Sequence, residues 1–484
     1  MQQASTLRDR GSRPTPGLST LRRTVTRPPC IDSLINESKR VILRWKYLCL
    51  VFSLSVLLGS PAAAQATEET ATEDWNAKFQ ATYVWQSKRP FTAAYSGQNS
   101  LTVNKEKSYS FTATAALGAR PWSDAEVYAD AEVAQGVPLS SLTGLGGFTN
   151  GEMARTSGAT PAFYRARLFL RQTWGFGGDD ESVESDMNQL AGKLDKRRVV
   201  LTAGNLSVMD IFDGNTYSHD PRVEFLNWAI MNHGAYDFAA DARGYSTGVA
   251  LEYFHDNWAI RVGRFAQPRL PNQQQLNYNL LQSYGDQIEL ERDYSIAEQS
   301  GKLRLLAFRN VARMSRYSDA LLRAARIGNI PDINQVRTGK QAKVGIGVNL
   351  EHAVTADIGV FVRAMWADGK TETYAFTEID RSLSSGAVVN GTAWGRREDK
   401  LRVAFARNGL SGSHQDYLVA GGLGFFIGDG RLRYQPETIL ETFYSARVMR
   451  NVWLTLDGQF IRNPAYNADR GPVKVASMRV HVEF

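Results

Sequence analysis

One short segment, Tyr217–Asn232, concentrates side chains that could take part in chemistry. It reads YSHDPRVEFLNWAIMN and combines carboxylates, an imidazole, a guanidinium, amides and an indole. Such a set can line a catalytic site, a sugar-binding groove or a constriction in a pore. The residues alone leave all three open, so the choice depends on the elements that hold them.

A catalytic site would need a nucleophile or a metal with partners at a matching spacing. The chain contains no Gly-x-Ser-x-Gly motif, and the glycine cluster at 421–426 does not match a phosphate-binding loop. No two histidines have the His-x-x-x-His spacing of a metal site. We therefore expect no enzyme, no metal and no cofactor. The histidines are His219, His233, His255, His352, His414 and His481.

A signal peptide is predicted near the N-terminus. Basic residues precede the apolar run Tyr47–Leu58, and the small residues Ala62–Ala66 follow it as a cleavage site. The run is shorter than the roughly 20 residues of a membrane helix. We expect a leader over residues 1–64, with the signal peptide at about 39–64, and an exported domain over residues 65–484. Residues 1–40, rich in Arg and Pro, are interpreted as sequence upstream of the true translation start.

The leader dominates the charge of the whole chain. The formal net charge is +7, but the leader holds 10 basic and 3 acidic residues, which leaves 46 of each in residues 65–484. A neutral exported domain gives no reason to expect a nucleic-acid partner. Both cysteines, Cys30 and Cys49, also lie in the leader. The exported domain therefore has no cysteine and no disulfide framework. The absence of cysteine suits passage through an oxidising compartment.

The exported domain alternates polar and apolar residues over segments of about ten residues. In Ala77–Lys88, AKFQATYVWQSK, apolar side chains share one face and polar side chains mainly the other. This pattern is typical of a transmembrane antiparallel β-barrel, apolar towards lipid and polar towards the lumen. A soluble β-sandwich or propeller is the alternative fold. Many Ala and Gly residues on the apolar faces, with aromatic residues near the strand ends, favour the barrel.

We predict about 16 strands, joined by links that alternate between short and long. Short links are expected on the periplasmic side and long ones outside. The link 176–196 breaks this rule, because it is long and acidic at a periplasmic position. The last strand ends in Phe484 and resembles the assembly signal of bacterial outer-membrane proteins. The predicted strands are 77–88, 108–119, 124–134, 162–174, 197–206, 244–255, 257–266, 285–294, 300–310, 341–351, 356–366, 379–392, 399–408, 436–447, 451–462 and 473–484.

The polar faces would meet water and solute in the lumen. Arg165, Arg167 and Arg171 alternate along one predicted strand and are expected to face inward, beside carboxylates of the preceding strand. Guanidinium and carboxylate groups bind hydroxyls and set up a field across a pore. The link 207–243 does not alternate, and helical spacing around Trp228 predicts a short helix there. A long link of this kind covers the mouth or folds into the lumen.

The run from Gly204 to Asp286, with GNLSVMDIFDGNTYSHDPRVEFLNWAIMNHGAYDFAADARGYSTG, RLPNQQQLN and YGDQIELE, resembles the carbohydrate-selective porin family, OprB type, of Gram-negative outer membranes. The segments HQDYLVAGGLGFFIGDGRLRYQPETILETFYS and NPAYNADRGPV are similar to the same family. The resemblance covers most of residues 75–484. It implies a 16-stranded outer-membrane barrel through which glucose and other sugars diffuse passively, without a cofactor.

In such porins, inward loops and lumen Arg and Glu residues form the constriction. The resemblance transfers that role to Arg165, Arg167, Asp220, Arg222 and Trp228. The expected partners are small carbohydrates, outer-membrane lipid and the barrel assembly machinery, and the chain is expected to be a monomer or a homotrimer. Two alternatives stay open. One is a general or anion-preferring porin, suggested by the Arg ladder; the other is an adhesin or export channel anchored by the barrel.

Overall fold

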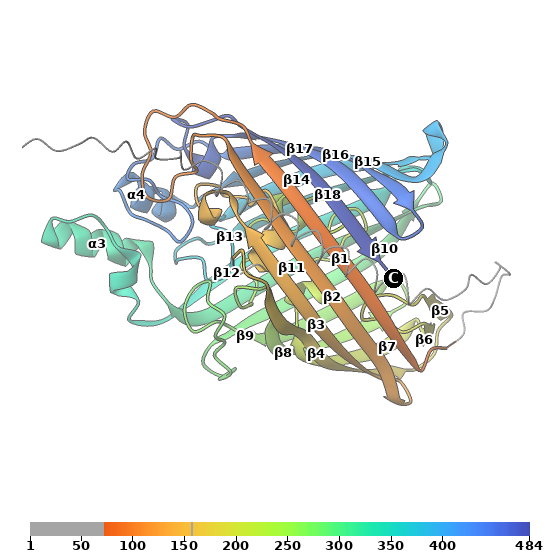
Figure 1. Cartoon of the computed structure of the whole chain (residues 1–484). Coiled ribbons are helices and arrows are strands. Elements are labelled where there is room, and N and C mark those ends of the chain that lie inside the picture. The colour runs from red at the N-terminus through yellow and green to blue at the C-terminus, as the bar shows by residue number, and fades with distance from the viewer. Residues whose placement is uncertain (1–71, 156–157) are drawn as a thin grey trace, which may run out of the picture. The chain divides into compact units, whose positions relative to one another are not determined.

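The computed structural model describes residues 72–155 and 158–484. Sixteen antiparallel strands close into one barrel, in which β4 pairs with β7 and the last strand, β18, pairs with β1 (Figure 1). The predicted all-β barrel and its strand count are confirmed. The predicted leader, residues 1–64, lies outside the described residues. Within the described ranges, no helix has the length and apolar composition needed to cross a membrane.

The barrel strands follow the predicted ones closely, and the remaining elements lie in the links. The barrel strands are β1 Trp75–Lys88, β2 Glu106–Trp122, β3 Ala125–Val137, β4 Ala162–Gly175, β7 Arg197–Leu206, β8 Ser246–His255, β9 Trp258–Ala266, β10 Tyr284–Ile296, β11 Gln299–Met314, β12 Gly339–Ala353, β13 Ile358–Ala367, β14 Arg381–Gly391, β15 Arg396–Gly409, β16 Glu437–Met449, β17 Val452–Arg462 and β18 Val473–Glu483. The links contain β5 Asp180–Val183, β6 Gly192–Asp195, α2 Trp228–Met231, α3 Tyr317–Ile327 and α4 Gly412–Val419. They also contain the 3-10 helices η1 Leu139–Leu142, η2 Gly151–Arg155, η3 Val208–Asp210, η4 Ile333–Val336, η5 Thr392–Trp394 and η6 Pro464–Tyr466.

Alternation in the sequence becomes alternation between the outside and the lumen. In β12, Ile346 and Val348 are exposed on the outside, whereas Lys343 and Asn349 are buried inside the barrel. Successive side chains of a strand point to opposite faces, so this division follows from the backbone alone. The outer face carries apolar side chains for lipid, and the inner face carries polar ones.

A β-bulge interrupts the alternation in β4. Asp130 of β3 is paired with Arg167, and the next residue, Ala131, is paired with Arg165, which leaves Ala166 without a partner. An unpaired residue reverses the side to which the following residues point. Arg167 therefore faces the lumen with Asp130, whereas Arg165 is exposed on the outside with Ala131. The prediction that Arg165 lines the lumen was wrong for this reason.

The two ends of the barrel differ as the link lengths predict. Long links, including those with α3 and α4, lie at one end, and the C-terminus lies with β5 and β6 at the other (Figure 1). We call the end with the long links the outer end and the other the periplasmic end, following the usual asymmetry of such barrels.

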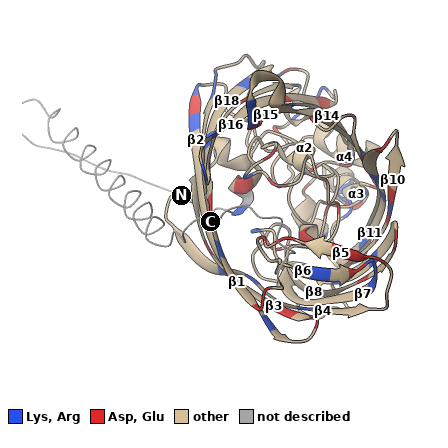
Figure 2. Ribbon diagram, turned by 90° about the vertical axis from the view of Figure 1, so that its right-hand side faces the viewer, with Lys and Arg blue, Asp and Glu red and all other residues tan. Residues whose placement is uncertain are grey.

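The long acidic link 176–196 is an ordered hairpin at the periplasmic end. Its two strands, β5 and β6, pair with each other, and in Figure 2 they lie across the opening of the barrel. The Asn188 side chain donates a hydrogen bond to Asp130 of β3 at 3.0 Å, and the Leu190 N–H donates to the Tyr128 hydroxyl at 3.0 Å. The link thus folds back onto the inner wall and narrows this end.

Candidate pore constriction

The link between β7 and β8, residues 207–245, crosses the lumen to the opposite wall. On β16, Glu441 accepts hydrogen bonds from two successive backbone N–H groups, including that of Asn227 at 3.0 Å. On β18, Arg479 donates to the carbonyl of Pro221 at 2.7 Å. These contacts reach strands on the far side of the ring, and α2 lies inside the ring in Figure 2. The link therefore folds into the lumen, one of the two arrangements that its length predicts.

Local capping explains how this link turns inside the barrel. The Asn227 side chain accepts a hydrogen bond from the Ala229 N–H at 3.0 Å and caps α2, which is the predicted short helix. The Asp220 side chain accepts from the Arg222 N–H at 2.8 Å, which is an Asx turn. These short polar side chains satisfy backbone groups that the barrel wall does not reach.

A buried ion pair holds the first half of the link. Asp213 is fully buried and accepts hydrogen bonds from Arg363 at 2.9 Å, from Asn349 at 2.7 Å and from the His233 N–H at 2.8 Å. Burial alone would raise the pKa of the Asp213 carboxyl, but Arg363 and the other donors hold it below its ordinary value. The carboxylate therefore stays ionised and keeps the link against β12 and β13.

Trp228 belongs to an aromatic cluster and not to the water-exposed wall. Its side chain packs against Phe376, with ring centroids 4.6 Å apart, and against Phe238 at 6.2 Å and Phe148 at 6.0 Å. Only 4% of the residue is exposed. The indole therefore joins three separate links into one packed unit, and a solute in the lumen cannot reach its face in this arrangement.

The other predicted residues, Arg167, Asp220 and Arg222, come together with further charged side chains. Arg222 lies 3.3 Å from both Glu132 and Glu152, and 3.6 Å from Asp220. We call the whole group the charge cluster; it contains Asp130, Glu132, Glu152, Arg155, Arg167, Asp210, Asp220 and Arg222. Strands β3 and β4 and the link between them, which contains η2, supply one side of it, and the link 207–245 supplies the other.

Arg167 joins the wall to the link through a two-pronged contact. Its Nε and Nη2 atoms both donate to the Asp210 carboxylate at 2.7 Å, and Nη1 donates to Asp130 at 3.1 Å. Planar contacts of this kind fix both partners in direction as well as distance. Arg155, from the link between β3 and β4, adds a contact of 3.2 Å to Glu152. Each of the three guanidinium groups is thus paired with at least one carboxylate.

Two tyrosines complete the cluster. The Tyr245 ring lies beneath the guanidinium groups of Arg155 and Arg167, at 5.3 and 5.4 Å from its centroid. Its hydroxyl donates to Glu132 at 3.3 Å, and the Tyr164 hydroxyl donates to the same carboxylate. Aromatic rings and paired charges therefore share one surface.

Exposure divides the charge cluster into a buried and an open part. The side chains of Glu132 and Glu152 are almost fully buried, whereas 37% of the Asp220 side chain and 27% of the Asp210 side chain are exposed. Burial raises the pKa of Asp220, but Arg222 and the turn hydrogen bond outweigh it and hold the pKa at about 2. The two open carboxylates keep lone pairs free to accept hydrogen bonds from a solute.

The sequence missed Arg155 and Tyr245 as parts of this site. Arg155 ends η2 in a link with no alternation, and Tyr245 directly precedes β8. No periodic pattern marks either residue, although Tyr245 lies within the quoted segment that resembles the porin family. Among the described residues, no group of three or more His, Cys, Asp or Glu side chains could hold a metal ion.

Residues 99–484 match the family described as carbohydrate-selective porin, OprB family. The chain belongs to this family. The high-pH structure of Pseudomonas putida OprB is similar to it with a TM-score of 0.63 and 15% identity, over 85% of this chain and 94% of that one. The low-pH structure of the same protein has a TM-score of 0.46 and 12% identity, over 85% and 93%. The outer-membrane channel DcaP of Acinetobacter baumannii has 0.49 and 9%, over 85% and 97%.

A search of curated protein sequences finds no match. The family and the fold identify this OprB-family protein as a porin of the outer membrane. The lumen-crossing link and the charge cluster are therefore features of a channel wall.

Proposed function

We propose that this porin lets small neutral carbohydrates, such as glucose, diffuse passively into the periplasm past the charge cluster. The observation that supports the proposal is the pairing of every guanidinium group in the cluster with a carboxylate. Paired groups offer hydrogen-bond donors and acceptors side by side, which suits the neighbouring hydroxyls of a sugar. Diffusion of this kind needs no cofactor and no energy source.

The pairing also argues against the alternative of an anion-preferring pore. An anion would need unpaired guanidinium groups, but Arg167 already contacts Asp130 and Asp210, and Arg222 contacts Glu132 and Glu152. The two most open groups of the cluster, Asp210 and Asp220, are negative and would repel an anion. A neutral solute avoids that repulsion and still binds the free lone pairs.

Of the five residues predicted from the sequence, the proposal keeps Arg167, Asp220 and Arg222 as contacts for the sugar. Asp210 joins them because it is exposed and fixed by Arg167. We also infer that the protein contacts the barrel assembly machinery through β18 and Phe484. We infer further that it is a monomer or a homotrimer.

Current block in planar bilayers tests the proposal. Glucose added to the wild-type channel should reduce the single-channel current in a saturable way, and Asp210→Asn with Asp220→Asn should weaken that block about tenfold or more, as expected for two lost charged hydrogen bonds. Asp319→Asn is the matched control, because Asp319 is exposed on α3 away from the cluster. An anion-selective wild-type current without sugar block would contradict the proposal.

A further inference from the structure

Basic side chains are gathered on the outward face of the barrel near its outer end. Within the described strands, one acidic residue, Asp286, shares this face and level, and it is paired with Arg264 at 2.7 Å. Arg165, which the sequence predicted to face the lumen, belongs to this group, which we call the basic belt. The belt consists of Lys107, Arg165, Arg264, Arg309, Arg313, Lys340, Arg381, Arg407, Arg462 and Lys474.

The belt lies at a depth where a protein surface normally meets lipid. Below it, the same faces of the strands expose large apolar side chains, such as Val403 and Phe405 beneath Arg407 on β15. Placing charge next to this apolar surface has an energetic cost unless the charge meets a counter-charge at the interface. We therefore expect negatively charged groups beside the belt, at the level of the lipid head groups.

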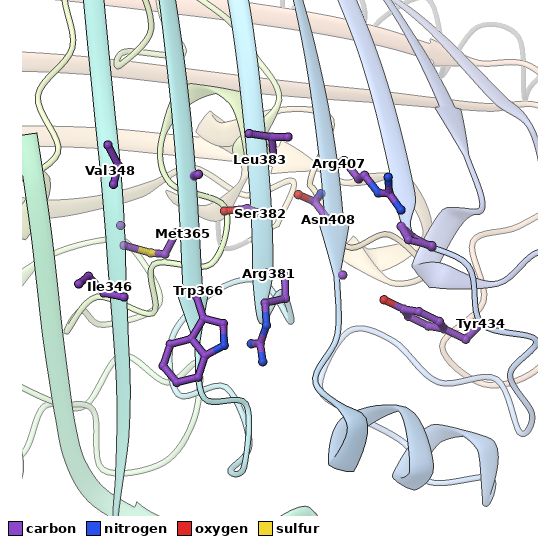
Figure 3. Close-up of a pocket in the computed structure, with 14 residues that line it drawn as sticks. Ile346, Val348, Met365, Trp366, Arg381, Ser382, Leu383, Arg407, Asn408 and Tyr434 are labelled. Atoms are coloured by element: carbon purple, nitrogen blue, oxygen red, sulfur yellow. The ribbon is translucent and has the colours of Figure 1, made fainter. Parts of the chain in front are cut away.

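A groove of about 540 Å³ opens on this outward surface across the outer ends of β12 to β15 (Figure 3). Its wall is largely apolar and includes the exposed side chains of Ile346, Val348, Trp366 and Leu383. The small residue Ala364 faces outward between larger neighbours and leaves room in the groove. The groove thus has the character of a site for a hydrocarbon chain.

Two guanidinium groups of the belt lie at the outer edge of this groove. Arg381 stacks on Trp366, 5.0 Å from the ring centroid, and donates a hydrogen bond to the Asp380 carbonyl at 2.7 Å. Arg407 lies on the neighbouring strand, paired with Leu383, on the same face (Figure 3). Among the described residues, neither arginine forms an ion pair. Both remain available to an anion, and Arg381 is already held in position.

We propose that this groove binds a phosphorylated lipid of the outer leaflet, with one acyl chain in the groove and its phosphate against Arg381 and Arg407. Phosphate accepts several charged hydrogen bonds from guanidinium groups, and basic side chains at a membrane surface attract anionic head groups. Free phosphate would leave the apolar groove empty. A second copy of the chain placed symmetrically on this groove would bring its own Arg381 and Arg407 to the contact and be repelled.

Native mass spectrometry of the delipidated full chain in a neutral detergent tests this assignment. The probes are a diphosphorylated glycolipid with several acyl chains and the same glycolipid with its phosphates removed. The wild-type protein should retain the phosphorylated probe preferentially. Arg381→Gln with Arg407→Gln should weaken that binding about thirty-fold, which is the expected effect of two basic residues at an anionic surface.

Two further variants separate charge from shape. Ala364→Phe fills the groove and should weaken binding of both probes while the arginines remain. Arg292→Gln is the matched control, because Arg292 faces outward near the periplasmic end, where it stacks on Trp258. It should leave binding unchanged. The heat-dependent shift on a gel checks that every variant still forms the barrel.

Equal retention of both probes would mean that ordinary boundary lipid fills the groove, and the proposal would fall. An equal loss in Arg292→Gln would show a non-specific charge effect, and displacement by millimolar inorganic phosphate alone would show a site for the free ion. Dimers in place of lipid adducts would make the surface an interface between copies. None of these outcomes depends on which solute the pore passes.

Discussion

The anchor between Arg363 and Asp213 decides whether the lumen-crossing link stays docked. Arg363 is 1% exposed and donates to the Asp213 carboxylate at 2.9 Å, to the Ser218 carbonyl at 2.7 Å and to the Ile230 carbonyl at 3.2 Å. Arg363→Met removes all of these contacts and leaves a buried carboxylate without its cation. Breaking a buried pair in this way costs about 3–5 kcal/mol.

This loss of stability should appear as local opening of the link and not as unfolding of the barrel. The strands are held by continuous hydrogen-bond ladders that the substitution does not touch, so the heat-dependent gel shift should persist. Amides at 228–236 open with the link, and their hydrogen exchange should accelerate about a hundred- to several-thousand-fold. Single-channel conductance should rise because the released link no longer narrows the lumen.

A double substitution provides the control for this prediction. Arg363→Met with Asp213→Asn removes both charges, and the protection lost in the single variant should return in large part, because a neutral pair leaves no buried unpaired charge. If Arg363→Met changes the exchange at 228–236 less than tenfold and leaves conductance unaltered, the anchor is not what holds the link, and the reasoning fails.

Three further predictions concern the residues that the sequence singled out. Arg165→Gln should leave conductance and sugar block unchanged in bilayer recordings, whereas Arg167→Gln should alter both, because only Arg167 faces the lumen; equal effects would contradict the bulge. Trp228→Ala should destabilise the packed links by about 3–5 kcal/mol, measured by hydrogen exchange of residues around α2, since it leaves a cavity; Trp228→Phe should cost less. The pKa of Asp220 is about 2 in the folded protein, below its ordinary value of 3.8. Its ion pair should therefore contribute fully above about pH 4 and be lost as the pH falls towards 2. The difference in sugar block between the wild type and Asp220→Asn should therefore stay constant from pH 7 to pH 4, and a decline in that difference already at pH 6 would count against this assignment.

The barrel was predictable because its signal is local. Whether a side chain of a strand points to lipid or to the lumen depends on its position along the strand, and the chain records this as a two-residue period. The predicted strands 285–294 and 379–392, for example, correspond to β10 and β14. The alternation of short and long links likewise predicted that most long links gather at one end of the barrel. The family resemblance, carried by long ordered segments, agrees with the family match over residues 99–484.

One inserted residue shows where local reasoning stops. The sequence around Arg165 and Arg167 alternates without interruption, yet the unpaired Ala166 sends the two arginines to opposite sides of the wall. The bulge is defined by how β4 pairs with β3, and pairing is a relation between two strands. The position of the link 176–196 at the periplasmic mouth also depends on a relation between distant segments, because the link contacts β3.

The sequence by itself determined that this chain crosses the outer membrane as a barrel and carries a polar, non-alternating link rich in charged, amide and aromatic side chains. Only the tertiary structure decided which of those groups face water. Trp228 is buried by aromatic residues from separate links, and Pro221 is held by Arg479, 258 positions away in the chain. Burial depends on neighbours that are distant in sequence, so no pattern within the segment Tyr217–Asn232 could separate its anchors, such as Asn227, from its open carboxylate, Asp220.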